Sequence, residues 1–173
     1  AVGVSTGIID CNNSTITIDG VGSSTGTSFT YLWTTSDGTI DSGQNTLNPT
    51  VSSSGTYTLT VTNTDNGCEE TVDVIVGEDL NEPVAVANGG AIDCANTSII
   101  IDGIGSDIGA EFTYLWTASG GGNIVNGSTT LSPTVDAAGT YTLTVTNTNN
   151  GCTSTETAEV TADLTPPTIN LSA

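Results

Sequence analysis

The stretch GTYTLTVTN occupies residues 55–63 and returns unchanged at residues 139–147. In it, Tyr57, Leu59 and Val61 alternate with threonines, which is the period-two pattern of a β-strand that buries one face and exposes the other. Threonine suits the exposed face, because it is both β-branched and polar. This strand therefore indicates the fold class, and its return indicates two copies of one module.

Four further landmarks support the repeat. They are Cys11, Trp33, Tyr57 and Cys68, which recur as Cys94, Trp116, Tyr141 and Cys152. We therefore expect one domain at residues 1–82 and a second at residues 83–166. Residues 167–173 then fall where the first strand of a third module would begin, or form a tail that exchanges between chains.

The remaining strand patterns complete an all-β module. STITIDG at 14–20, FTYLWTT at 29–35 and TVDVIV at 71–76 alternate in the same way, and Asn66-Gly67 and Asp37-Gly38 mark tight hairpins between strands. No segment has a helical pattern, so short strands separated by turns predict a β-sandwich. The residues predicted to form the two cores are Trp33, Tyr57, Leu59, Trp116, Tyr141 and Leu143. In the second copy, Ile100 replaces the outward-facing Thr17.

Each module carries two cysteines, one near its start and one at its last predicted hairpin. Pairing Cys11 with Cys68 and Cys94 with Cys152 would give each module one disulfide, worth roughly 4 kcal/mol in the chain-entropy model. Such bonds require an oxidising compartment. Free buried thiols are the alternative. A metal site fits less well, because the chain has no CxxC spacing and no histidine.

The charge of the chain excludes several classes of function. Lysine, arginine and histidine are absent, and 19 acidic residues give a formal charge of −19. Nucleic acid and anionic lipid are therefore poor partners, because nothing neutralises their phosphates. The usual general base and the Schiff-base amine are also missing, so we expect no enzyme. No apolar run is long enough to span a bilayer, so we expect no direct membrane insertion.

Certain motifs resemble known families. A tryptophan in the third strand and a Gly-x-Tyr that opens the sixth are similar to the immunoglobulin-like layout with its tyrosine corner. The string DGVGSSTGTSFTYLWTTSDGT at 19–39, followed by GTYTLTVTN and NGC, resembles the polycystic-kidney-disease (PKD) type repeats. It also resembles the cysteine-bounded repeats of large Bacteroidetes surface adhesins, including those of gliding motility. The resemblance implies two tandem immunoglobulin-like, PKD-like sandwiches at a bacterial cell surface.

An acidic linker joins the two modules and is a candidate calcium site. GEDLNEP at 77–83 contains the oxygen-bearing residues Glu78, Asp79, Asn81 and Glu82. Hard cations prefer clustered oxygen ligands, and the segment loosely resembles the calcium-binding linkers of cadherins. The alternative is a solvated linker stiffened by proline. The next linker, TADLTPP at 161–167, keeps only Asp163.

Repetition of one strand-rich unit predicts a structural spacer of an extracellular bacterial surface adhesin or fibre that projects a distal binding region. Its expected partners are neighbouring repeats of the same chain or filament. One alternative is a homopolymeric extracellular filament, in which TINLSA at 168–173 completes a neighbour's sheet by strand addition. Another is a carbohydrate-binding module with surface glycans as partners, although the aromatic residues fall at inward positions of the strand pattern.

Overall fold

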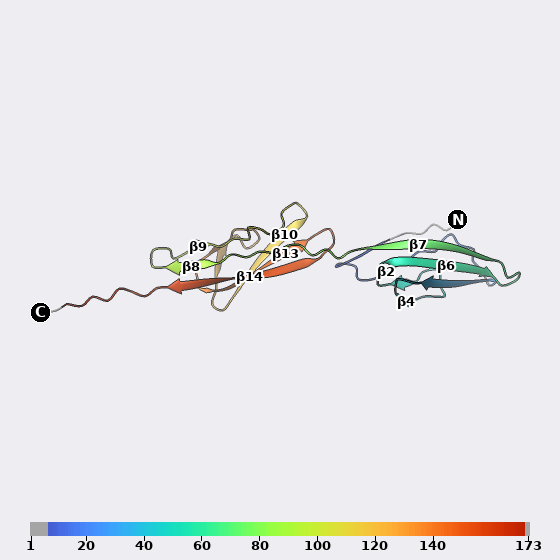
Figure 1. Ribbon diagram of the computed structural model, residues 1–173, viewed down its shortest axis with the longest axis horizontal. Helices are drawn as coiled ribbons and strands as arrows, with labels where there is room; N and C mark the ends of the chain where they lie inside the picture. Colours follow the sequence, from blue (N-terminus) through green and yellow to red (C-terminus); the bar gives the residue numbers. More distant parts are fainter. Residues whose placement is uncertain (1–6, 172–173) are drawn as a thin grey trace. The chain divides into compact units, whose positions relative to one another are not determined.

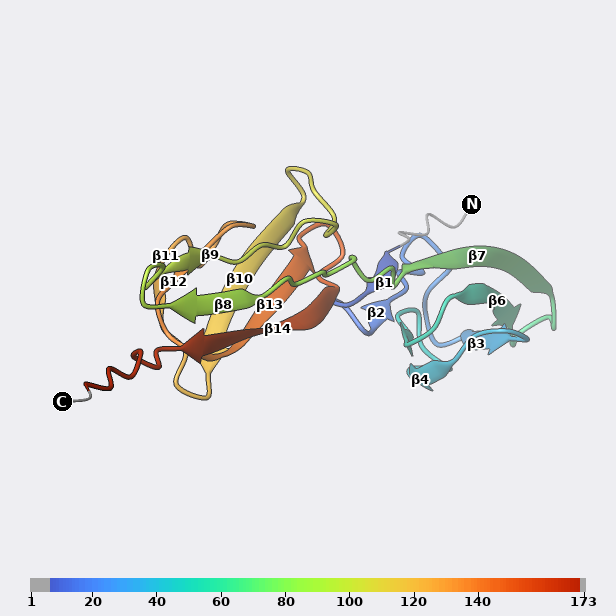
Figure 2. The ribbon, with the colours of Figure 1, turned by 60° about the vertical axis from the view of Figure 1, so that its left-hand side comes forward.

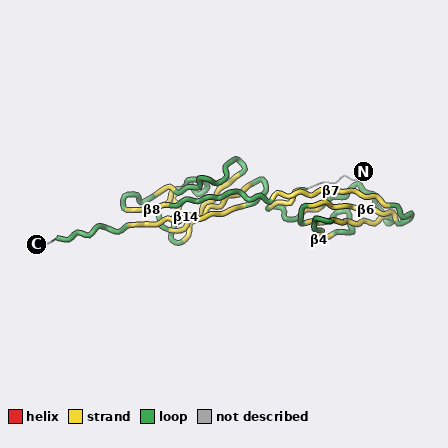
Figure 3. Tube along the Cα trace, in the orientation of Figure 1, coloured by secondary structure: helices red, strands yellow, loops and turns green. Residues whose placement is uncertain are grey.

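The computed structural model describes residues 7–171, and the chain divides into two compact units, Ala1–Asn81 and Glu82–Ala173 (Figure 1). This division lies one residue before the boundary expected from the repeat. The described residues form strands and loops only (Figure 3), so the predicted all-β class is confirmed. Within residues 7–171, no helix is long and apolar enough to cross a membrane.

The first unit contains two sheets. The four-stranded sheet has the order β1-β7-β6-β3 and consists of β1 (Ile8–Asp10), β3 (Phe29–Thr35), β6 (Gly55–Asn63) and β7 (Glu69–Asp79). The three-stranded sheet has the order β2-β5-β4 and consists of β2 (Ile16–Thr17), β4 (Ile40–Ser42) and β5 (Thr50–Val51). The stretch that opened the sequence analysis is therefore an inner strand, β6, paired on both sides.

The second unit repeats this arrangement strand for strand. Its four-stranded sheet, β10-β13-β14-β8, consists of β8 (Gly90–Asp93), β10 (Phe112–Ser119), β13 (Gly139–Asn147) and β14 (Thr153–Asp163). Its three-stranded sheet, β11-β12-β9, consists of β9 (Ile99–Ile100), β11 (Ile124–Asn126) and β12 (Thr134–Val135). Each unit is thus an immunoglobulin-like sandwich, as the sequence predicts.

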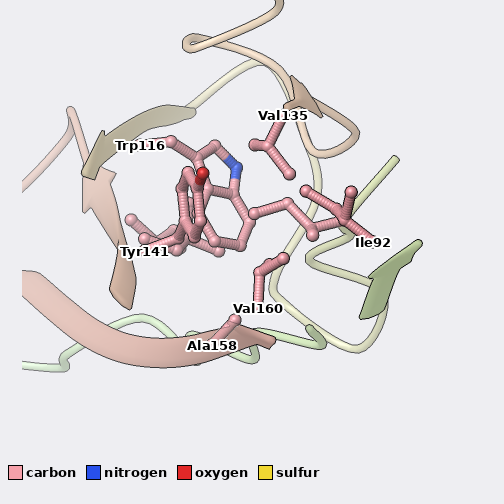
Figure 4. Close-up of a cluster of buried hydrophobic side chains, with 9 residues drawn as sticks. Ile92, Trp116, Val135, Tyr141, Ala158 and Val160 are labelled. Carbon is pink, nitrogen blue, oxygen red and sulfur yellow. The ribbon is translucent and has the colours of Figure 1, made fainter. Parts of the chain in front are cut away.

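The two sheets of each unit enclose one hydrophobic core. In the first unit, Trp33 and Tyr57 of the larger sheet pack in one buried cluster with Val51 of β5. In the second unit, Figure 4 shows the matching cluster around Trp116 and Tyr141. The six residues predicted from sequence to form the cores are at most 2% exposed. Ile100, which lies at an outward-facing position of the strand pattern, is 67% exposed to solvent.

A buried tyrosine ties β6 to the loop before it. The Tyr57 hydroxyl donates to the carbonyl of Ser53 at 2.7 Å and accepts from the backbone N–H of Thr39 at 3.0 Å. The tyrosine is fully buried, so these two bonds satisfy the only polar atom that it brings into the core. This is the tyrosine corner expected from the Gly-x-Tyr motif. The same bonds recur in the second unit; their partners are Tyr141, Ala137 and Asn123.

The first strand of each unit runs parallel to the last one, and it pairs only with the final residues of that strand. In the first unit Ile8 pairs with Gly77 and Asp10 with Asp79. In the second unit β8 pairs with the end of β14 in the same way (Figure 2). Cys11 therefore lies beside the end of β7, whereas Cys68 immediately precedes its first residue.

This pairing separates the two cysteines of a module. The strand between them has 11 residues, which at ~3.3 Å per residue span roughly 36 Å. A disulfide needs Cα atoms within about 7 Å of each other. The predicted pairs Cys11–Cys68 and Cys94–Cys152 are therefore wrong. In the structure Cys11 and Cys152 are disulfide-bonded, whereas Cys68 and Cys94 are free and exposed.

Candidate functional site

The chemistry-bearing residues of each unit are its two cysteines, and each cysteine lies in a tight turn. We call residues 10–13 and 93–96 the first-strand turns, and residues 63–68 and 147–152 the hairpin turns. In the first-strand turn of the first unit, the Asp10 carboxylate accepts the backbone N–H groups of Asn12 at 2.9 Å and Asn13 at 2.7 Å. The N–H of Asp10 donates to the carbonyl of Asn13 at 3.1 Å and closes the turn around Cys11.

The first-strand turn of the second unit has the same bonds around Cys94. The Asp93 carboxylate accepts the backbone N–H groups of Asn96 at 2.6 Å and Ala95 at 2.8 Å. The hydrogen bond from Asn96, followed by that from Ala95, lowers the pKa of Asp93 below its usual value, because both donors stabilise the charged form. The turn is thus held most firmly when the aspartate is ionised.

The hairpin turns position the other cysteine of each unit. In the first unit the N–H of Gly67 donates to the carbonyl of Asn63 at 2.7 Å, and Gly67 has a φ of +73°, a conformation that favours glycine. The N–H of Cys68 donates to the Asn66 side-chain oxygen at 2.9 Å. The N–H of Asn63 in turn donates to the carbonyl of Cys68 at 2.8 Å. The Asn-Gly pair noted in the sequence therefore builds a rigid frame around a thiol.

The aromatic residues do not form a sugar-stacking platform. All eight lie within the described residues, and none of them is exposed. The indole N–H of Trp33 donates to the carbonyl of Thr46 at 2.9 Å, and that of Trp116 donates to the carbonyl of Thr130 at 3.0 Å. Both indoles are therefore used inside the sandwich, as the strand phase predicts.

Two of the four linker residues proposed as calcium ligands belong to the end of β7. Glu78 and Asp79 are consecutive residues of β7, so their side chains point to opposite faces of the strand. The Asp79 carboxylate accepts from the side-chain amide of Asn81 at 2.8 Å. Within residues 7–171, no group of three or more His, Cys, Asp and Glu side chains is placed to hold a metal ion. Calcium binding by these residues and Glu82 stays a prediction.

One cleft of about 290 Å³ lies on the first unit beside the hairpin turn. Its walls include Phe29, Leu59 and Val61 on the apolar side and Glu69 and Glu70 on the acidic side. The cleft has no signal in the sequence, because its walls come from segments far apart in the chain. The only nucleophile among its lining residues besides serine and threonine hydroxyls is Cys68, and the chain has no histidine or lysine to activate it.

No curated protein matches the sequence. The three N-terminal domains of the bacteriophage RB49 outer capsid protein Hoc are 17% identical with a TM-score of 0.47, and the match covers 94% of this chain and 59% of that three-domain chain. Titin domains z1z2, solved in complex with telethonin, are 13% identical with a TM-score of 0.35, and the match covers 96% of this chain and 100% of the titin chain. The eight N-terminal immunoglobulin domains of DSCAM are 10% identical with a TM-score of 0.37, and the match covers 87% of this chain and 23% of the DSCAM chain. Residues 80–162, nearly all of the second module, match the family of PKD-like domains.

Proposed function

We propose that the chain is a structural spacer of an extracellular bacterial surface adhesin or fibre, whose modules hold a distal binding region away from the cell. The observation that carries this proposal is the strand-for-strand identity of two units, each with its own closed core. Each unit can then fold by itself and add a constant length to an array. The aromatic side chains are buried or half-buried in these sandwiches, so few of them are available to contact a receptor.

The surface of the chain suits a crowded exterior. A disulfide requires an oxidising compartment, and the formal charge of −19 is not offset by any basic side chain. Neighbouring copies repel each other at distances up to about 10 Å in 0.1 M salt. Such repulsion would keep fibres apart until their tips engage a target.

A second candidate, the homopolymeric filament, has one supporting observation. Aligning Pro167 with Pro83 places Ile169 and Leu171 at the positions of Ala85 and Ala87. Those two alanines pack against the core of the second unit, whereas Ile169 is 83% exposed and Leu171 is 95% exposed. The segment therefore has the sequence pattern of a first strand, and strand addition to another copy would bury its two apolar side chains.

Small-angle X-ray scattering of the reduced chain separates these candidates. A spacer should remain monomeric, with a radius of gyration above the roughly 16 Å of a compact globule of this length. A filament subunit should instead form assemblies that grow with protein concentration and disappear in the double variant Ile169→Asp, Leu171→Asp. A monomer at the compact value would contradict the spacer. Growth that the double variant abolishes would replace the spacer with the filament.

A further inference from the structure

Four Asn-Gly pairs occur in the chain, beginning at Asn66, Asn88, Asn126 and Asn150. At such a pair the backbone nitrogen of the glycine can attack the carbon of the asparagine side-chain amide, which closes a succinimide ring and releases ammonia. Glycine favours this attack because it has no Cβ to crowd the nitrogen. The sequence marks all four pairs alike, whereas the hydrogen bonds around them differ in the structure.

We propose that Asn66 is a self-modification site, at which the nitrogen of Gly67 displaces the side-chain amide nitrogen and water then opens the ring. The Oδ1 atom of Asn66 accepts the backbone N–H of Cys68 at 2.9 Å. Because an N–H group faces it, this atom is the oxygen of the side-chain amide. The bond draws electrons away from the amide carbon and stabilises the negative charge that the oxygen acquires during the attack.

The hairpin turn also keeps the two reacting atoms close together. The ring closed by the bond from Cys68 N–H to Asn66 Oδ1 contains both the Cγ atom of Asn66 and the nitrogen of Gly67. The N–H of Gly67 donates to the carbonyl of Asn63 at 2.7 Å, and this bond must open before the nitrogen loses its proton. A Cβ atom at Gly67 would meet no atom within 4 Å, so the turn has room for this movement.

Asn88 is followed by the same residue type, but its surroundings oppose the reaction. Its side-chain nitrogen donates to the Asp102 carboxylate at 2.9 Å, which leaves more electron density on the amide carbon. The backbone N–H and carbonyl of Asn88 are bonded to Asp102 at 2.8 and 3.2 Å. A Cβ atom at Gly89 would collide with the carbonyl oxygen of Glu159, so this backbone cannot turn. Asn66 and Asn88 are both exposed, so solvent access does not distinguish them.

Asn63 supplies the opposite comparison, since it has the hydrogen bond but no glycine after it. Its Oδ1 atom accepts the backbone N–H of Asp65 at 3.0 Å. The residue that follows it is Thr64, whose β-branched side chain crowds the attacking nitrogen. Asn63 and Asn88 thus each lack one of the two features that Asn66 combines.

The reaction balances with water as the only co-reactant. The bond from Gly67 N to Asn66 Cγ forms as the bond from Cγ to Nδ2 breaks, and the proton from the Gly67 nitrogen leaves with the ammonia. Water then adds across either carbon–nitrogen bond of the ring, which gives aspartate or isoaspartate. Each event adds one negative charge to the formal −19. The chemistry concerns one turn, so it is independent of the spacer function proposed above.

The test incubates the purified full chain in a mildly alkaline buffer and follows each asparagine by chymotryptic digestion and tandem mass spectrometry. In the folded chain we expect conversion at Asn66 to be at least about tenfold faster than at Asn88, which corresponds to roughly 1.4 kcal/mol. Asn63 should remain unconverted. In concentrated urea, where the turns are lost, Asn66 and Asn88 should react at similar rates. Equal rates at Asn66 and Asn88 in the folded chain, or no conversion at Asn66, would overturn the proposal.

Two substitutions test the assignment by charge. Isoelectric focusing of the unaltered chain should show a more acidic band that grows with time, because an amide becomes a carboxylate. Asn66→Gln should slow the growth of this band, since glutamine would have to close a larger ring. Asn88→Gln is the matched control and should leave the growth unchanged. An acidic band that grows as fast in Asn66→Gln as in the unaltered chain would refute the assignment to Asn66.

Discussion

Replacing Tyr57 with phenylalanine should destabilise the first module alone. The substitution removes a hydroxyl that donates to Ser53 at 2.7 Å and accepts from Thr39 at 3.0 Å, while the ring stays fully buried. Each buried polar group left without a partner costs about 1–3 kcal/mol. Since Ser53 is half-buried and Thr39 is exposed, we take the lower part of that range for each group and expect a total loss of about 2–3 kcal/mol.

Urea unfolding followed by tryptophan fluorescence measures this loss module by module. Trp33 and Trp116 are the only tryptophans, one in each core, so Trp116→Phe leaves a reporter of the first module. With the disulfide reduced, and with a slope of about 1 kcal/mol per M for a domain of this size, the urea midpoint should fall by roughly 2–3 M. The second module, followed in a Trp33→Phe background, should keep its midpoint.

Tyr31→Phe is the matched control. Its hydroxyl donates to the carbonyl of Ser24 at 2.9 Å in an exposed setting, where water can replace the lost bond. We expect a change below about 1 kcal/mol. A loss under about 0.5 kcal/mol in Tyr57→Phe, or an equal loss in the control, would refute the assigned importance of the tyrosine corner.

Three further experiments test the close packing at Gly38, the turn at Asp93 and the acidic linker at Glu78. Gly38→Ala should lower the stability of the first module by about 1–3 kcal/mol in urea titrations, since the new methyl group would clash with both the hydroxyl and the ring of Tyr57; Gly77→Ala, whose methyl group would meet no atom within 4 Å, should change it by less than about 0.5 kcal/mol, and equal losses in the two variants would contradict the clash. The turn around Asp93 should stabilise the second module fully above the ordinary carboxyl pKa of 3.8 and lose that contribution as pH falls through the lowered folded-state pKa; Asp93→Asn should flatten this part of the pH dependence, and an unchanged profile would count against it. Calcium should raise the melting midpoint more than magnesium at equal ionic strength if Glu78 and its neighbours bind it; Glu78→Gln should remove the difference, and equal midpoints in the unaltered chain would contradict the calcium prediction.

The fold could be predicted because its signals are local. Alternation in GTYTLTVTN predicted a buried face, and Tyr57 and Leu59 are fully buried in β6. Asn66-Gly67 predicted the hairpin before β7, where Gly67 has the positive φ that the turn needs. Period-two patterns and turn residues are properties of a few consecutive residues, so they can be recognised without any knowledge of the tertiary structure.

The cysteine pairing could not be predicted, because it depends on a non-local contact. β1 is only three residues long, too short to show a clear alternation. Its parallel register with the end of β7 decides where Cys11 lies. Even cysteine counts and equal spacing are compatible with bonds inside a module and with bonds from module to module. Only the pairing of the first strand with the last shows that Cys11 and Cys68 lie at opposite ends of β7.

Pulling single chains from their two ends under reducing conditions tests the proposal that the chain is a spacer of independently folding modules. The chain should unfold in two similar steps of roughly 250 Å each, one per module. A single unfolding step for the whole chain would contradict this account.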